Sequence, residues 1–109
     1  MSQLEPSPEG AVKHDSGKPS LDLLPVESLY EIQRVMEFGA QKYAVHNWRK
    51  GMGWRRPLGA ALRHLFAWAA GEDLDPESGL SHLAHAGCNI LFLLSYSKTG
   101  AGTDDRYKT

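Results

Sequence analysis

Histidines and carboxylates cluster in the second half of this 109-residue chain, at spacings that suit metal and phosphate chemistry. His82 and His85 stand three residues apart, so a helix places both imidazoles on one face, together with Ser78 and Asn89. Imidazole is a good ligand for transition metals, and carboxylates suit Mg²⁺ or Mn²⁺. One group of residues is therefore able to hold a cation against a phosphate: His64, Glu72, Asp75, His82 and His85.

Charge is distributed unevenly along the chain. Residues 34–63 carry seven basic side chains and one acid, Glu37, whereas residues 72–77 carry four acids and no base. A site for a metal-bound polyphosphate needs both kinds of charge. Two solvated surface patches would explain the same pattern. Hydrogen bonds across a helical bundle would likewise explain the histidines, and Asn89 suits either a core polar contact or a base-edge contact.

Other segments carry weaker signals. Lys13, Asp15 and Lys18 surround Gly17 on an arm suited to wrapping a phosphate. Trp48 and Trp54 lie among arginines and lysines, a combination that stacks on flat rings but that also anchors loops and subunit contacts. Cys88 lies among apolar residues and is expected to be a buried, inert thiol.

Apolar periodicity predicts three helices, over about 26–43, 57–70 and 75–96, separated by a loop over 44–56 and a link of about five residues. Asp75 is expected to be the N-cap of the third helix and Pro76 its first residue. The short link makes the second and third helices an antiparallel hairpin. The core face of the second helix is predicted to carry Leu58, Leu62, Leu65 and Ala69.

These elements define an all-α fold, a small bundle of three helices. Residues 13–97 form one domain, between flexible tails over 1–12 and 98–109. The net charge of −1, the single cysteine and the polar N-terminus argue against a nucleic-acid polymer, a disulfide scaffold, a membrane partner and an export signal. We therefore expect a cytoplasmic protein. Because so short a chain buries a modest core, we also expect a homodimer or homotetramer.

Several stretches taken together resemble a known family. They are Lys13–Lys18, Glu37–Tyr43, Asn47–Gly51, Ala61–His64 and Gly71–Gly79, followed by His82, His85 and Asn89. In this combination they are similar to phage dATP/dGTP diphosphohydrolases (MazZ-like), which are distant members of the all-α MazG-like NTP pyrophosphohydrolases. The resemblance covers about residues 13–96.

The resemblance implies cleavage of a purine (d)NTP between its α- and β-phosphates, giving (d)NMP and pyrophosphate in phage nucleotide metabolism. It also implies two or three Mg²⁺ or Mn²⁺ ions inside a bundle formed by associating subunits. The wider superfamily carries a Glu-Glu-x-x-Glu cluster on one helix and Glu-x-x-Asp on the next. Here the second predicted helix has no such cluster, and the third reads His82-Leu-Ala-His85 at the corresponding place. The candidate metal ligands are therefore Glu37, Glu72, Asp75, Glu77, His82 and His85, with Glu37 or Glu72 activating the water.

We thus predict a metal-dependent nucleoside triphosphate pyrophosphohydrolase. The candidate substrate-binding residues are Lys13, Asp15, Lys18, Lys42, Asn47, Trp48, Arg63, His64 and Asn89. A non-catalytic helical module that binds a nucleotide or a protein is the alternative from another class. An HD-type phosphohydrolase is a third reading, disfavoured because the contiguous His14-Asp15 pair lies on the glycine-containing arm rather than on a helix.

Overall fold

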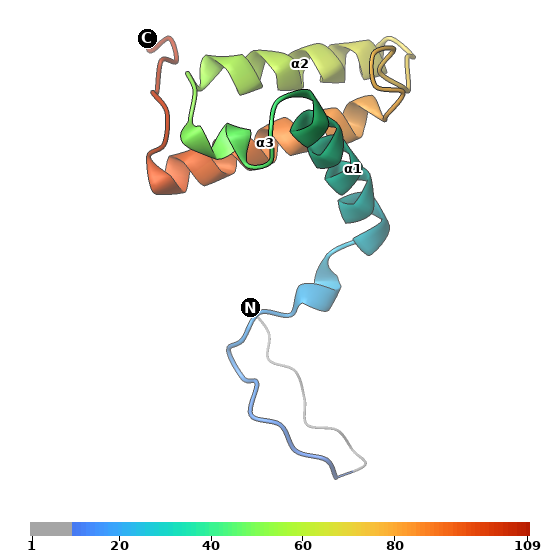
Figure 1. Ribbon diagram of the computed structural model, residues 1–109. Helices are drawn as coiled ribbons and strands as arrows, with labels where there is room; N and C mark the ends of the chain where they lie inside the picture. The colour runs from blue at the N-terminus through green and yellow to red at the C-terminus, as the bar shows by residue number, and fades with distance from the viewer. Residues whose placement is uncertain (1–9) are drawn as a thin grey trace.

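A computed structural model describes residues 10–109 and shows three α-helices (Figure 1). They are α1 (Val26–Lys42), α2 (Arg55–Ala69) and α3 (His82–Thr99), with short 3-10 helices η1 (Leu21–Leu23) and η2 (Asn47–Lys50) before and after α1. Within residues 10–109 the only β-type pairings are two isolated bridges, so the predicted all-α class is confirmed. The flexible tail predicted over 1–12 falls, for residues 1–9, outside the described part of the chain.

Helix α1 has nearly the predicted limits, beginning directly after Pro25 and ending where the Tyr43 N–H bonds the Gly39 carbonyl. It packs on α3 through Val35, which is buried together with Ala84 and Cys88. Small residues on α3 let the two helices approach closely, since a Cβ added at Gly87 would lie 2.9 Å from Cδ1 of Ile32. The chain before α1 leads away from the three helices (Figure 1).

Helices α2 and α3 run antiparallel, side by side, so the predicted hairpin is confirmed (Figure 1). The predicted core face of α2 is wrong. Leu58 and Leu62 are 37% and 42% exposed, and the buried stripe consists instead of Pro57, Ala61 and His64. Apolar periodicity marks the leucine face, but the small and polar stripe is the one that fits closely against the alanines and histidines of α3.

The start of α3 also differs from the prediction, because Asp75 and Pro76 form a turn and not a helix start. The Gly79 N–H bonds the Asp75 carbonyl at 2.7 Å, and Gly79 has a φ of 71°. Helix α3 begins at His82, and Ser81 is its N-cap, accepting hydrogen bonds from the N–H groups of Leu83 and Ala84. Asp followed by Pro suits the first two positions of a β-turn as well as a helix start. Because these residues form a turn here, the link between α2 and α3 spans residues 70–81 and is longer than the predicted five residues.

The C-terminal segment makes contacts that the sequence did not predict. Helix α3 continues beyond the expected Tyr96 to Thr99, and the chain then returns to the start of α2. The Trp54 N–H bonds the Thr103 carbonyl at 3.0 Å, and the Arg55 N–H bonds Oδ1 of Asp105 at 2.9 Å. These bonds satisfy backbone donors at the start of α2, which helps to explain why that helix begins two residues earlier than expected. Among residues 10–109, no helix combines the length and hydropathy needed to cross a bilayer.

Candidate functional site

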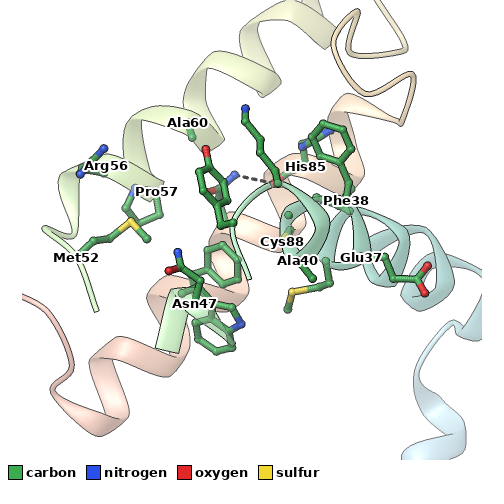
Figure 2. A pocket seen from close by; sticks show the side chains of 18 of the residues that line it. Glu37, Phe38, Ala40, Asn47, Met52, Arg56, Pro57, Ala60, His85 and Cys88 are labelled. Atoms are coloured by element: carbon green, nitrogen blue, oxygen red, sulfur yellow. Dashed lines mark hydrogen bonds between the residues drawn. The ribbon is translucent and has the colours of Figure 1, made fainter. Parts of the chain in front are cut away.

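A groove of about 1020 Å³ lies between α1, the loop after it, and the α2–α3 pair. Figure 2 shows Arg56, Pro57 and Ala60 of α2 on one side and Phe38 and Ala40 of α1 on the other. Its lining combines an apolar part with two sets of charged and polar groups. The cations are Lys42, Arg49, Lys50, Arg56 and Arg63, and the potential metal ligands are Glu37, His46, His64, Asp75, Glu77, His85 and Cys88.

Three buried histidines from the two antiparallel helices lie close together, and two of them, His64 and His85, line this groove. His64 comes from α2, while His82 and His85 come from the first turn of α3. The rings of His64 and His85 stack with centroids 4.4 Å apart and planes 11° apart. The Nδ1 atoms of His64 and His82 lie 2.8 Å apart, within hydrogen-bond distance. The predicted i, i+3 pair therefore converges with a third imidazole from the neighbouring helix.

Carboxylates from the α2–α3 link surround the histidines. Oε1 of Glu72 lies 2.7 Å from Nε2 of His82. Oδ2 of Asp75 accepts hydrogen bonds from the backbone N–H and the hydroxyl of Ser78, at 2.9 and 3.0 Å. The Ser78 hydroxyl also lies 2.7 Å from Nε2 of His85, which is itself 3.8 Å from Asp75. Ser78 thus connects a carboxylate to an imidazole, from a turn and not from the predicted helix.

The surroundings favour neutral imidazoles beside an ionised carboxylate. Burial lowers the pKa of His64, and the neighbouring His85 lowers it further. Burial likewise lowers the pKa of His85, although Asp75 opposes this effect. For Asp75, burial raises the pKa, but the two hydrogen bonds from Ser78 outweigh it and the net shift is downward. Metal ligands must be deprotonated, so these directions suit a cation site.

The structure gathers most, but not all, of the predicted metal ligands. Glu72, Asp75, His82 and His85 belong to the histidine cluster. Glu77 lies apart from them, bonded to Nζ of Lys42 at 2.7 Å across the lip of the groove. Glu37 is exposed on α1, and Figure 2 shows its carboxylate directed away from His85.

The predicted substrate-binding residues separate into two groups. Six line the groove: Lys42, Asn47, Trp48, Arg63, His64 and Asn89. Lys13, Asp15 and Lys18 do not line it, because they lie on the arm that precedes η1. His14 lies on the same arm, so the described structure does not bring the contiguous His14-Asp15 pair of an HD-type site to the groove.

The Trp48 ring is already engaged within the protein. It stacks on Phe92 with centroids 4.7 Å apart, and the Arg49 guanidinium lies 4.6 Å from its centroid. The Trp48 carbonyl accepts a 2.6 Å hydrogen bond from the Tyr96 hydroxyl. These contacts favour the loop-anchoring reading of Trp48 over base stacking.

Several residues at the site, among them Phe38, Ser78 and Arg56, were not among the candidate site residues selected from the sequence. Phe38 presents its ring at 84° to that of His85, with centroids 6.4 Å apart. Nothing in the local sequence pattern indicates that this ring would face an imidazole. Ser78 was noted on the polar stripe, and only the turn geometry shows that it bridges Asp75 and His85.

The donor chemistry of the cluster fits a divalent cation. His64, Asp75 and His82 each offer one ligand atom, and these three atoms lie within 4.8 Å of one another. In the part of the chain that the structure describes, this is the one such group of three. Two nitrogens and one carboxylate oxygen form a common set of protein ligands, which leaves further positions open for water or substrate.

A histidine–carboxylate cluster beside a basic groove is suited to binding a divalent cation together with a phosphorylated ligand. Comparison with known proteins gives the family. Residues 8–106 match the family described as dATP/dGTP diphosphohydrolase, N-terminal, and the chain belongs to it. The expected resemblance is thereby confirmed.

One relative of the chain is a dATP/dGTP diphosphohydrolase from Salmonella phage PMBT28. The two sequences are 36% identical over 95 residues, which cover 87% of this chain and 32% of that protein. The chain therefore spans about a third of the length of this relative. No solved structure matches the chain.

Proposed function

We propose that this chain carries the catalytic site of a metal-dependent pyrophosphohydrolase that converts purine (d)NTPs, dGTP and dATP in particular, to (d)NMP and pyrophosphate. The observation that carries the proposal is the position of the histidine–carboxylate cluster at the foot of a groove lined by Lys42, Arg56 and Arg63. Family membership and the name of the phage relative, a dATP/dGTP diphosphohydrolase, support the substrate class.

Different charged groups of the groove are suited to different parts of a bound triphosphate. His64, His82 and Asp75 would hold a divalent cation, for which the family resemblance implies Mg²⁺ or Mn²⁺. Such a cation would supply neutralisation of phosphate charge and a lowered pKa for a bound water. Arg56, Arg63 and Lys42 line the same groove and offset the charge that develops on the departing pyrophosphate. The apolar lining, which includes Phe38, Pro57 and Ala60, accommodates the base and excludes water from it.

Hydrolysis requires a group that accepts the proton of the water. Of the two carboxylates predicted for this role, Glu37 points away from the cluster and Glu72 is bonded to His82. His85 lines the groove, and burial lowers its pKa, so its imidazole is neutral near pH 7. We assign proton acceptance to His85, with Ser78 orienting the ring through their 2.7 Å contact. Water then attacks the α-phosphorus, and the bond to the β-phosphate oxygen breaks.

We also propose that the protein works as a homodimer or homotetramer. Large apolar side chains on the outer faces of α2 and α3 are exposed, including Phe66 at 70%, Ile90 and Leu94. Burial of these side chains between copies would stabilise an assembly. A sedimentation mass of a multiple of 12.1 kDa at micromolar concentration supports this, and a mass equal to the monomer refutes it.

Product analysis tests the function. The chain is incubated with each of the four dNTPs and Mn²⁺ or Mg²⁺, and the products are separated by anion exchange and identified by ³¹P NMR. Monophosphate with pyrophosphate, formed fastest from the purines and lost in Arg63→Ala, is the expected result. Release of triphosphate would indicate an HD-type reaction. Nucleotide binding without turnover would indicate a non-catalytic module.

A further inference from the structure

We infer that His64, Asp75 and His82 form a binding site for a divalent first-row transition metal, and that this site prefers such an ion to Mg²⁺. The three side chains come from α2, from the α2–α3 link and from the first turn of α3. The two histidines are buried and Asp75 is half-buried, so the site sits inside the hairpin rather than on its surface. The inference deepens the proposed function, but it stands on the geometry of these side chains and does not require turnover.

The hydrogen bond between Glu72 and His82 prepares one ligand nitrogen. A carboxylate only accepts, so Nε2 of His82 carries the hydrogen in their 2.7 Å contact. In the neutral ring the lone pair is then on Nδ1, the atom that faces Nδ1 of His64 at 2.8 Å. A carboxylate that holds the far N–H of an imidazole is the usual partner of a metal-binding histidine. Glu72 is therefore a positioning residue and not a ligand.

The other two ligands are also held in place. Nδ1 of His64 lies 2.8 Å from Nδ1 of His82, so in the metal-free protein His64 donates the hydrogen between them. When a cation binds there, His64 carries its hydrogen on Nε2 instead, which frees the lone pair of Nδ1. The stacked ring of His85 limits the rotation of His64. Oδ2 of Asp75 is fixed by the two hydrogen bonds from Ser78, whereas Oδ1 accepts no hydrogen bond within residues 10–109.

Donor chemistry decides which cation such a site selects. Mg²⁺ prefers oxygen ligands and gives up its waters reluctantly, whereas imidazole nitrogen favours iron, cobalt, nickel, copper and zinc. Two of the three donors here are imidazoles, and none of the acids of residues 72–77 other than Asp75 belongs to the group of three. The site is thus expected to bind Co²⁺, Zn²⁺ and Fe²⁺ tightly, Mn²⁺ more weakly and Mg²⁺ least.

Cobalt is a suitable probe because its visible absorption reports nitrogen coordination directly. The full chain, freed of metal with EDTA and dialysed, is titrated with Co²⁺ and then with competing ions. We expect one Co²⁺ per chain, displacement by stoichiometric Zn²⁺, and no displacement by a large excess of Mg²⁺. Displacement of Co²⁺ by Mg²⁺ at comparable concentration, or absence of a visible band, would overturn the inference without the use of any variant.

Variants then test the individual residues. His64→Gln and His82→Gln should each abolish the Co²⁺ band, whereas His14→Gln, which alters an exposed histidine on the arm, should leave it unchanged. Glu72→Gln should weaken Co²⁺ binding by about 10- to 100-fold, the range for a residue that orients a ligand. Circular dichroism confirms that each variant is folded. Retention of the full band by a folded His82→Gln variant would remove this residue from the site. If the unmodified chain binds Co²⁺ as expected but produces no pyrophosphate from dNTPs, the proposed function is refuted and the metal-site inference stands.

Discussion

The hydroxyl of Tyr96, the most deeply buried side chain of α3, donates a 2.6 Å hydrogen bond to the carbonyl of Trp48. Trp48 belongs to η2, the short helix that places Asn47, Arg49 and Lys50 on the groove. The stacking of Trp48 on Phe92 joins the same two elements. The groove wall formed by η2 is therefore fixed to the last turns of α3, some distance from the histidine cluster.

Removal of this hydroxyl should weaken the whole fold slightly. The Trp48 carbonyl also accepts from the Gly51 N–H at 3.1 Å, so Tyr96→Phe leaves one of its two partners in place. We expect a loss of about 1 kcal/mol in the free energy of unfolding, the net value of one hydrogen bond. Urea denaturation measures it, with Tyr107→Phe as the control, because that side chain is 88% exposed. Equal stability of the two variants would show that the bond is not formed in solution.

The start of α3 supplies a second stability test. The Ser81 hydroxyl accepts from two N–H groups of the first turn, so Ser81→Ala should lower the free energy of unfolding by about 0.5–2 kcal/mol. Ser97→Ala is the matched control, since its hydroxyl bonds only the Leu94 carbonyl within the same helix. If the two substitutions have the same effect, Ser81 is not the cap.

The sequence was a good guide where one physical signal dominated. The apolar period of residues 26–43, together with the proline before them, predicted α1 correctly. The spacing of His82 and His85 likewise predicted that both lie on one face of a helix. The pattern Asp75-Pro76 carried two meanings, an N-cap and a β-turn. The choice between them depends on Gly79 and on the cap at Ser81, which are tertiary and local details that periodicity does not contain.

The site was harder to predict than the helices because it combines residues from separate elements. His64 was grouped with His82 and His85 around a possible cation and assigned to substrate binding, but only the register of α2 against α3 shows that its ring contacts both of theirs. Glu37 was selected as a metal ligand on the basis of the family resemblance, but its carboxylate points away from His85 in the structure (Figure 2). Contacts of this kind follow from packing between helices, which spacing within one helix does not determine.

Cys88 should be nearly unreactive in the folded protein. Its side chain is buried, and burial raises the pKa of the thiol to about 11 from an ordinary value near 9.0. At pH 8 the thiolate population is then about 100-fold smaller than in the unfolded chain, before any steric protection is counted. Alkylation by iodoacetamide, followed by mass spectrometry with and without guanidinium, measures the ratio. Labelling at the same rate in both conditions would place the thiol at an accessible surface.

Acid should destabilise the metal-free protein through its histidines. The pKa values of His64 and His85 are lowered in the folded state, whereas the unfolded chain titrates near 6.5. Below that pH the unfolded state binds more protons, so the free energy of unfolding falls as the pH drops from 7 toward 5. Asp75, whose pKa is lowered from 3.8, contributes only at more acidic pH.

Urea midpoints in EDTA between pH 8 and pH 5 measure this dependence. They should be nearly constant above pH 7, and the decline below it should be shallower in a His85→Gln variant. A stability that rises on acidification would mean that the imidazoles are charged in the folded protein.

The ion pair between Lys42 and Glu77 connects the end of α1 to the α2–α3 link at the lip of the groove. Glu77 raises the pKa of Lys42 by accepting its hydrogen bond, so Lys42 is a cation already engaged with an acid. If Lys42 binds substrate phosphate, as we propose, Glu77 competes for it. Glu77→Gln should then lower the KM for dGTP by up to about fivefold, while Lys42→Ala raises it, and the stability of both variants should change little because an exposed ion pair contributes little to folding. The matched control is Glu31→Gln, which breaks the comparable exposed pair with Arg34 on the same helix without touching the groove. A large fall in kcat for Glu77→Gln would contradict this role and would instead support Glu77 as a ligand of the catalytic cation.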